Sequence, residues 1–390
     1  MTEFADIAAQ IKLEREQIAQ GLKQLRDNTS KLEDKDYASA SVYGVASIEQ
    51  LIPLVVARIE ATNNRIKEGK TGASFKEIQR YLMDIEPEAA AAIACKVTFD
   101  KVFSPKPKSS LVQNVTDSIG QAIENECMMR YYERNVPGLL HIIKENYFHR
   151  SIGTDQKVKV VTTLMNRYDV DHWQCWGIAN RVKLGGWLLD CICESSHWFT
   201  REIRRQGRKT HNYVVPTPEF ISIKDQVMCN AELFSPLAWP MLIEPNDWSN
   251  ENPGGYLLNE VMRGHDMVRR SDPCLIQGET PINFLNKIQK VGYTLNTFVV
   301  DVAETLQERG VEVGKFIPVV YIPLPPKPVD IAENAESRKD YRRRAAEVCN
   351  INAQAFVKSC RTRMTMNAVK IFKQYEKFYI PWSFDYRGRA

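Results

Sequence analysis

The sequence has little that would support a membrane-bound, secreted or disulfide-stabilised protein. A segment that crosses a bilayer needs about eighteen consecutive apolar residues, and no apolar run in this chain approaches that length. We therefore expect no membrane partner. The N-terminus, residues 1–6, lacks a basic region followed by an apolar one, which argues against a secretory signal or a mitochondrial transit peptide. The nine cysteines form no CxxC pair, which indicates reduced thiols and no structural zinc site.

The sequence also lacks a recognisable catalytic motif. There is no H-E-x-x-H pattern and no acidic pair in a setting that suits metal-assisted chemistry. Gly69-Lys70-Thr71 resembles the end of a phosphate-binding loop, but Asn64 stands where such a loop needs glycine, and the pattern before it is helical. We therefore expect no catalytic residues and no metal ligands in this chain.

Positive charge is concentrated, although the whole chain carries a formal net charge of only +4. Residues 201–209, 338–344 and 358–377 together carry +13, so the remainder carries −9. Clustered cations favour a polyanionic partner more than an evenly basic surface does. A solvated helix face would explain any one of these basic segments. It explains the presence of three such segments in one chain less well.

The apolar pattern predicts a mainly α protein. Helical spacing with capping residues predicts helices over 4–34, 47–67, 74–83, 87–103, 110–133, 133–149, 154–167, 171–194, 280–309, 335–349 and 351–377. Ser47 and Ser74 each open a capping-box pattern, and Thr280 precedes a proline that suits a first helical turn. The prolines of 322–330 exclude a helix and predict an extended linker.

A basic β-hairpin is predicted over 199–215. Its β-branched and aromatic residues lie on both sides of Gly207, and cations surround that glycine. Such a tip suits phosphate contacts, and an ordinary solvated hairpin is the alternative interpretation.

The C-terminus combines a strand pattern with a phosphate-binding pattern. Bulky and aromatic residues alternate over 378–384, as in a short half-buried strand. Asp385, Arg387 and Arg389 then surround Gly388, where the backbone can approach a ligand closely. Two guanidiniums at such a turn suit phosphate, since arginine offers a planar fork of donors. A strand end with a solvated Asp–Arg pair is the alternative.

This C-terminus resembles the strand and DxRGR segment at the start of the palm in single-subunit, bacteriophage-type RNA polymerases, which have mitochondrial and chloroplast relatives. Tyr386 stands where that family often has tryptophan. Stretches that resemble the family's N-terminal domain are Ser74-Phe-Lys-Glu-Ile78, Ile85-Glu-Pro-Glu-Ala-Ala90, Val112–Glu124 and the order WPM, W and GGY over 239–256. The resemblance covers nearly all of this chain but only part of the family's domains.

The resemblance implies three parts. A promoter-binding domain would occupy 1–275, thumb-like long helices 276–377, and the truncated start of a palm 378–390. The implied fold is a helical N-terminal domain with a β-hairpin, a long-helix thumb and the first strand of a palm.

The resemblance also implies the sites. Contacts to double-stranded promoter DNA would come from a loop that enters the minor groove and from the hairpin, which in the family enters the upstream edge of the bubble: Lys67, Lys70, Ser74, Arg201, Arg204, Arg205, Arg208 and Lys209. The RNA–DNA hybrid would be contacted by Lys358, Arg361, Arg363, Asp385, Arg387 and Arg389. We expect Asp385 to orient one of these arginines rather than to bind metal.

In this family the carboxylates that hold the two catalytic metal ions follow the DxRGR segment. We therefore expect a DNA-directed RNA polymerase that uses Mg²⁺ and nucleoside triphosphates only as the complete enzyme, and an inactive chain that binds neither by itself. The chain would be a truncated product, or the N-terminal subunit of a split enzyme with a palm–fingers partner, in the cytoplasm of an infected host cell. The alternatives are a stand-alone helical DNA-binding protein or transcription regulator, and a helical scaffold with solvated basic faces.

Overall fold

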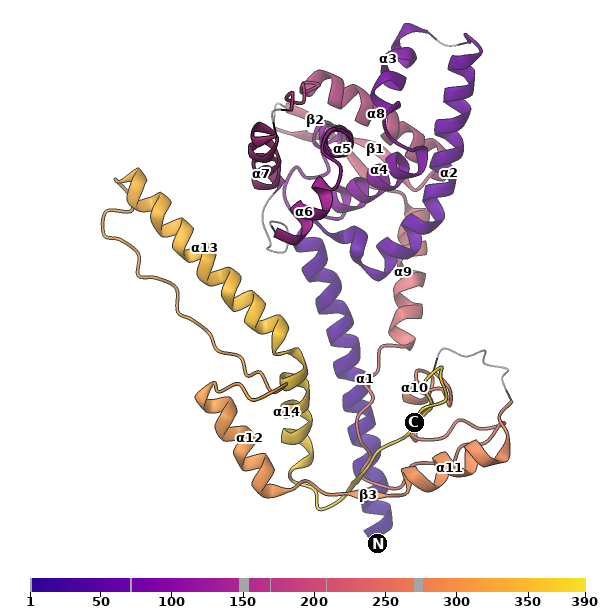
Figure 1. Cartoon of the computed structure of the whole chain (residues 1–390). Helices are drawn as coiled ribbons and strands as arrows, with labels where there is room; N and C mark the ends of the chain where they lie inside the picture. The colour runs from indigo at the N-terminus through magenta and orange to yellow at the C-terminus, as the bar shows by residue number, and fades with distance from the viewer. Residues whose placement is uncertain (1, 71, 147–153, 169, 208, 270–275) are drawn as a thin grey trace. The chain divides into compact units, whose positions relative to one another are not determined.

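The computed structural model describes residues 2–70, 72–146, 154–168, 170–207, 209–269 and 276–390 (Figure 1). The helices are α1 (Thr2–Asp34), η1 (Ala38–Ala40), α2 (Val42–Lys67), α3 (Ala73–Leu82), α4 (Pro87–Val102), α5 (Val112–Asn135), α6 (Leu139–Asn146), α7 (Thr154–Arg167), α8 (Ile178–Ser196), α9 (Pro218–Leu233), α10 (Asn259–Met262), α11 (Glu279–Gln289), α12 (Thr297–Arg309), α13 (Ala335–Lys358) and α14 (Cys360–Phe372). The strands are β1 (Phe199–Gln206), β2 (Lys209–Pro216), β3 (Gly292–Tyr293) and β4 (Phe378–Tyr379). The predicted mainly α fold with a β-hairpin is confirmed.

The chain forms two compact units. Unit 1 contains residues 1–21 and 236–390, and unit 2 contains residues 22–235, so helix α1 contributes to both. The predicted functional ranges 1–275, 276–377 and 378–390 follow from a resemblance rather than from contacts within the chain, and they stay predictions.

Unit 2 is built on the close pair α5 and α8. A Cβ added at Gly120 would collide with the carbonyl group of Arg181, and one added at Gly185 would collide with that of Thr116. Because glycine alone lacks a Cβ, these two positions let the helix backbones approach each other.

An aromatic cluster joins the hairpin to the core of unit 2. Phe99, Phe103, Phe199 and Phe220 lie with ring centroids between 5.4 and 6.4 Å apart, several of them edge to face. This geometry is favourable for aromatic pairs. The first residue of β1 is therefore fixed from two helices, α4 and α9.

Helix α2 is long and apolar enough, by length and composition alone, to cross a membrane. Its Tyr43, Leu51, Val55 and Ile59 side chains are buried in the core of unit 2, and the helix packs on α4, α8 and α9. A core helix passes the same test, so this one helix is weak evidence for a membrane location.

Unit 1 holds the C-terminal stretch by backbone pairing. Met241 and Tyr379 exchange two hydrogen bonds of 2.7 Å, and β3 pairs with β4 in an antiparallel sheet. The N–H of Phe384 donates to the carbonyl oxygen of Met267 at 2.7 Å. The segment that begins with the WPM motif therefore supports the C-terminus.

The two predicted capping boxes are wrong, since each helix begins earlier. Ser41, not Ser47, caps α2, because its hydroxyl oxygen accepts the N–H of Gly44 at 3.0 Å. Gly72, not Ser74, is the N-cap of α3, and it makes no side-chain capping bond. A capping-box pattern inside a sequence of good helix formers does not force the helix to start there.

The single helix predicted over 280–309 is also wrong. The structure has α11 and α12 with β3 between them, since Gly292 and Tyr293 pair with β4. Asn296 then caps α12 by accepting the N–H of Val299 at 3.1 Å. The apolar stripe continues through this break, so a helical period alone could not reveal a strand partner that lies distant in the chain.

Other boundaries shift for local reasons. The predicted basic helices meet at Ser359 rather than at residue 350, and α14 ends at Phe372. Regular strand structure in 378–384 is limited to β4, because Pro381 has no N–H to donate. The segment predicted as helix over 171–194 becomes helical only at Ile178, and the one over 133–149 gives α6, with 147–149 outside the described residues.

Candidate nucleic-acid interface

The β1–β2 hairpin has an apolar base and a basic outer end. Phe199, Tyr213 and Val214 are buried at the base, and the N–H of Val214 donates to the carbonyl oxygen of Ser110 at 2.8 Å. Side chains described nearer the turn are exposed. Gly207 begins the turn with φ of 61°, which glycine adopts without strain. The predicted hairpin with a basic tip is present.

The side chains of β1 divide between the two faces of the hairpin, because they alternate along a strand. Arg201, Ile203 and Arg205 share one face, and Glu202 and Arg204 share the other. The cations are therefore presented in two directions.

Two hairpin arginines have partners within unit 2. Arg201 Nη2 lies 2.6 Å from Asp190 Oδ1 on α8, although burial raises the pKa of Asp190 more than Arg201 lowers it. Arg204 Nη2 lies 2.8 Å from Glu202 Oε2, and its guanidinium lies 5.3 Å from the ring centroid of Tyr213. The hydrogen bond between Arg204 and Glu202 raises the pKa of the first and lowers that of the second. Exposed ion pairs are weak, so phosphate can compete for both arginines.

The other predicted hairpin cations lie nearer the turn. Arg205 Nε donates to the carbonyl oxygen of Gly207 at 3.2 Å, and Lys209 is exposed. Arg208 lies outside the described residues. The turn is thus bordered by cations from both strands.

The sequence interpretation missed an apolar residue within this basic hairpin. The side chain of Ile203 is 71% exposed and lies on the same face as Arg201 and Arg205. Its signal in the sequence is a single aliphatic residue among the cations of 201–209. An exposed aliphatic group between arginines can contact a base pair while the arginines meet phosphates.

The predicted minor-groove loop connects α2 and α3. Lys67 ends α2 and is exposed, and Lys70 is exposed in the loop, with Nζ 2.7 Å from Glu68 Oε2. Gly69 turns the chain with φ of 75°. Ser74 lies in the first turn of α3, and its side chain is outside the described part of the structure.

Lys358, Arg361 and Arg363 lie around the junction of α13 and α14. Lys358 and Arg361 are exposed. Arg363 lies 3.6 Å from the ring centroid of Phe356, and it donates to the Phe356 carbonyl oxygen at 3.1 Å and to Ser359 Oγ at 3.3 Å. Arg363 therefore stabilises the junction itself, a role that the sequence did not indicate.

Asp385 organises the C-terminal motif. Its carboxylate accepts the backbone N–H groups of Arg387 and Arg389, each at 2.9 Å, and the Arg389 guanidinium at 2.8 and 2.6 Å. These hydrogen bonds hold the pKa of Asp385 below its usual value, and the bond from the backbone N–H of Arg389 contributes most to this shift. Gly388 has φ of 75°, and Arg387 Nε donates to the hydroxyl of Tyr386 at 2.8 Å. The expected orientation of an arginine by Asp385 is present.

The C-terminal motif is anchored by Trp248 of the motif segment 239–256, by Phe284 of α11 and by Arg269. Trp248 Nε1 donates to the carbonyl oxygen of Trp382 at 3.0 Å, and the ring of Phe384 stacks on that of Phe284 at 6.2 Å. The N–H of Arg269 donates to the carbonyl oxygen of Phe384 at 2.9 Å. Phe384, the residue directly before the DxRGR motif, is therefore held in place.

The described residues do not fit a magnesium site. Across that part of the chain, no group of three or more His, Cys, Asp or Glu side chains is placed to hold a metal ion. Asp385 is held by Arg389, and a lone carboxylate among cations is poorly suited to Mg²⁺.

Known proteins similar to this chain are RNA polymerases. The family described as "DNA-directed RNA polymerase N-terminal" matches residues 9–272. The chain is 24% identical to T7 RNA polymerase of Escherichia phage T7 over 377 residues, which cover 88% of this chain and 40% of the relative. It is 21% identical to the DNA-directed RNA polymerase of Enterobacteria phage T3, with 98% and 44% covered. It is also 21% identical to the chloroplastic DNA-directed RNA polymerase 3B of Nicotiana tabacum, with 70% and 32% covered. The chain thus spans less than half of each of these relatives.

Proposed function

Since this chain belongs to the DNA-directed RNA polymerase N-terminal family, as its motifs predicted, we propose that it binds promoter DNA and the RNA–DNA hybrid within a phage-type, single-subunit RNA polymerase. The α2–α3 loop contacts the duplex upstream, through Lys67, Lys70 and Ser74. The hairpin holds the upstream edge of the bubble. The junction of α13 and α14, with Lys358, Arg361 and Arg363, and the segment 385–389 contact the hybrid.

The hairpin is the observation that carries this proposal. Its base is fixed in the core through Phe199 and Val214, while its outer end combines Arg205 and Lys209 with the exposed Ile203. A firmly held apolar side chain can replace part of the stacking that is lost when a base pair opens. The neighbouring cations offset the charge of the separated backbones.

The hybrid contacts rest on the C-terminal motif. A guanidinium in a fixed orientation binds phosphates and sugar hydroxyls without reading bases. Arg389 is fixed by Asp385 in this way. Such contacts suit a hybrid whose sequence changes at every step of synthesis.

Polymerisation itself is assigned to a palm–fingers part that these residues do not supply. That part would bind Mg²⁺ and nucleoside triphosphates, as two-metal nucleotidyl transfer requires. The chain alone is then inactive, and the complete enzyme works in the cytoplasm of an infected host cell, as the phage relatives suggest. The chloroplastic relatives make an organelle the other candidate compartment.

DNA binding by the chain is tested by fluorescence anisotropy over a salt series. If roughly four to six phosphates are neutralised, log K should fall with log salt with a slope of about −4 to −5. A flat series would contradict the proposed interface and favour a scaffold with solvated cations.

A stand-alone regulator is the second candidate function, and transcription separates it from a polymerase part. The chain is incubated with promoter DNA, Mg²⁺ and nucleotides, with and without a palm–fingers polypeptide of a phage relative. We expect a transcript only with the added polypeptide. Transcript from the chain alone would overturn the assignment of catalysis to another part, and DNA binding without any restored synthesis would favour the regulator.

A further inference from the structure

Unit 2 contains a cavity of about 980 Å³, and its lining includes no residue of the hairpin or of the α2–α3 loop. Its walls come from the C-terminal ends of α3 and α5, the segment 171–176 and the first turn of α8. Pockets of this size accommodate small organic ligands or a few nucleotide units. None of the sites described above includes its residues.

Buried polar contacts hold the segment 170–177 in place. Glu124, 5% exposed on α5, accepts the backbone N–H of Trp176 at 2.6 Å and Nε1 of Trp173 at 3.3 Å. The hydroxyl of Tyr132 accepts the backbone N–H of Trp173 at 3.0 Å. Arg181 lies 3.7 Å from the same Glu124 carboxylate. The two tryptophans are therefore fixed before any ligand arrives.

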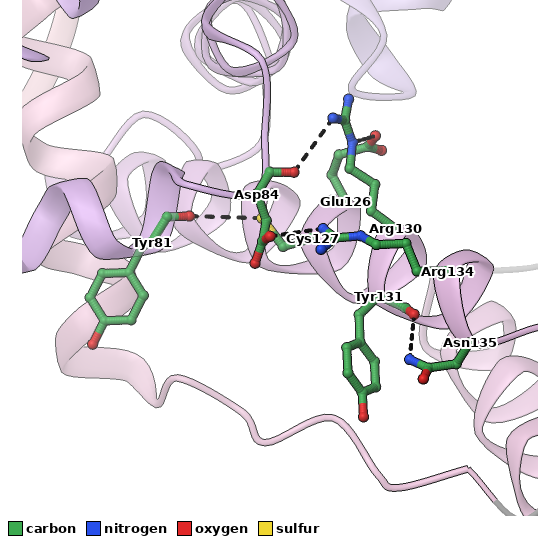
Figure 2. Close-up of polar contacts among 8 residues, drawn as sticks. All are labelled: Tyr81, Asp84, Glu126, Cys127, Arg130, Tyr131, Arg134 and Asn135. Atoms are coloured by element: carbon green, nitrogen blue, oxygen red, sulfur yellow. Dashed lines mark hydrogen bonds and ion pairs between the residues drawn. The ribbon is translucent and has the colours of Figure 1, made fainter.

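Four aromatic rings from three elements line this cavity. The ring centroids of Tyr81 and Trp176 lie 4.7 Å apart, those of Tyr131 and Trp173 5.7 Å, and those of the two tryptophans 6.1 Å. All four side chains are half-buried, so each keeps surface in contact with solvent. Figure 2 shows the rings of Tyr81 and Tyr131 pointing to one side of their helices, away from the Asp84–Arg134 ion pair.

The polar groups around the rings suit a nucleotide. Two carboxylates line the cavity: Asp84 is paired with Arg134 at 2.8 Å, which offsets its charge (Figure 2), and Asp171 is exposed to solvent. Arg80 is exposed at the cavity and can reach a phosphate. Gln174 offers its amide group to base edges, and Asn180, whose Nδ2 donates to the carbonyl oxygen of Trp176 at 2.8 Å, offers its Oδ1. Base faces stack on aromatic rings in the same way whatever the sequence.

We propose that this aromatic pocket, defined by Tyr81, Tyr131, Trp173 and Trp176, binds unstacked bases of a single-stranded nucleic acid. The inference rests on the proposed function, because a melted promoter and a growing transcript both supply single strands. Stacking gives the pocket an affinity that depends little on salt, whereas the basic hairpin gives one that depends steeply on salt. The two kinds of contact can therefore be separated by experiment.

The first test locates the base. Short single-stranded DNA and RNA oligonucleotides that carry 5-iodouracil are photo-crosslinked to the chain, and the modified peptides are mapped by mass spectrometry. We expect crosslinks at Tyr81, Tyr131, Trp173 or Trp176. A preference for the RNA or the DNA arm identifies whether the transcript or a promoter strand is the source. Crosslinks confined to the hairpin would overturn the pocket.

The second test measures its contribution to affinity. Tyr81→Ala should weaken binding of the single strands about tenfold at every salt concentration without a change in salt slope, as the loss of one base–ring stack predicts. Tyr81→Phe keeps the ring and should bind as the original chain does. Tyr168→Ala removes an exposed tyrosine of unit 2 that is not in the pocket, and it should have no effect.

The outcomes distinguish this inference from the proposed function. If the chain binds no single or double strand at any salt concentration, the nucleic-acid function itself fails. If salt-dependent binding persists but Tyr81→Ala binds like Tyr81→Phe and Tyr168→Ala, the pocket is not a base site. Binding of abasic oligonucleotides as tight as that of their base-containing counterparts would overturn the inference in the same way.

Discussion

The guanidinium of Arg389 donates Nε and Nη2 to one carboxylate oxygen of Asp385, at 2.8 and 2.6 Å, while the other oxygen accepts the backbone N–H of Arg389 at 2.9 Å. One carboxylate thus fixes both the main chain and the side chain of this arginine. An asparagine at position 385 would keep an acceptor but lose the charge that strengthens these bonds.

In the complete polymerase, we expect Arg389→Ala to leave promoter affinity within a few-fold of the original. It should shorten the lifetime of complexes with short hybrids and lower RNA yield, because the contact is to the hybrid. Asp385→Asn should act in the same direction but more weakly. Gel shifts for promoter affinity, beside abortive and run-off yields on one template, measure both effects. A large affinity loss with normal elongation would instead place Arg389 in promoter binding.

The charge on Asp385 also sets a pH range for this contact. Its pKa is lowered in the folded chain, so the interaction contributes stability above the unfolded pKa of about 3.9. That contribution is lost as pH falls through the lower, folded pKa. The role of Arg389 should therefore not change between about pH 5 and pH 8.

Charge at the hairpin is predicted to assist strand separation. Replacement of Arg204, Arg205, Arg208 and Lys209 by alanine in a complete polymerase should slow opening of duplex promoters. Pre-melted templates should be affected much less, since their strands are already apart. Fluorescence of 2-aminopurine at the upstream edge of the bubble measures opening. Equal losses on both templates would show that the cations supply general affinity alone.

The apolar group at the hairpin should contribute differently from the charges. Ile203→Ala should reduce opening of duplex promoters without changing the salt slope of DNA binding, because an aliphatic group neutralises no phosphate. Ile221→Ala is the matched control, since Ile221 is a partly exposed isoleucine of unit 2 that lies on α9. If the two variants open promoters equally well, Ile203 is not a wedge.

The fold was predictable from the sequence where the signal is local. The long apolar stripes gave most helices, and Gly207 with its flanking strands gave the hairpin. Prediction failed where a distant partner decides the structure, as at Gly292 and Tyr293, whose pairing with β4 divides a stretch of helical periodicity. Periodicity records which face is buried, and it does not record which segment covers that face.

The candidate site shows the same division. The expectation that Asp385 orients an arginine rested on a lone carboxylate among nearby cations in a short motif, and the contact with Arg389 is present. Arg363 looked from its charge like a nucleic-acid contact, yet it also packs on Phe356. The pocket around Trp176 could not be predicted from the sequence, because Tyr81 lies far from it in the chain and the tryptophans are more typical of a core than of a stacking surface, and they do pack against the core of unit 2.

Helix α1 makes a further testable contact within unit 1. Glu14 is fully buried and accepts the backbone N–H groups of Leu257 and Leu258, the shortest at 2.7 Å, and Nε2 of Gln10 at 2.8 Å. Glu14→Ala leaves these three donors without a partner, one of them fully buried, and should cost roughly 3 kcal/mol of unfolding free energy. Glu16→Ala, an exposed change on the same helix, should cost less than about 0.5 kcal/mol.

Urea unfolding measures the stability of both variants, and hydrogen exchange of the Leu257 and Leu258 amides reports on the contact itself. Those two amides should exchange faster in Glu14→Ala, and their exchange rates should be unchanged in Glu16→Ala. Equal stability of the two variants would show that the carboxylate is not needed to hold the segment.

His265 should make unit 1 sensitive to mild acid. It is 7% exposed, and its ring centroid lies 5.4 Å from that of Trp248 and 5.3 Å from that of Tyr256. Burial, with a smaller contribution from the charge of Arg269, lowers its pKa to about 4. In the unfolded chain the His265 ring has an ordinary pKa of about 6.5. Between about pH 6.5 and pH 4 the unfolded chain therefore binds a proton at His265, whereas the folded chain keeps this ring neutral.

Because the unfolded state binds more protons in this range, stability is complete above about pH 6.5 and falls as pH decreases toward 4. The loss at pH 5 should be about 2 kcal/mol relative to pH 7, from the difference between the two pKa values. His265→Gln has no proton to gain, so its unfolding free energy should change much less over that range. Urea unfolding at pH 7, 6 and 5 compares the two chains, and NMR titration of the His265 ring reads its pKa directly. Parallel pH profiles for both chains, or a ring that titrates near 6.5 in the folded protein, would show that His265 is not held neutral by its surroundings.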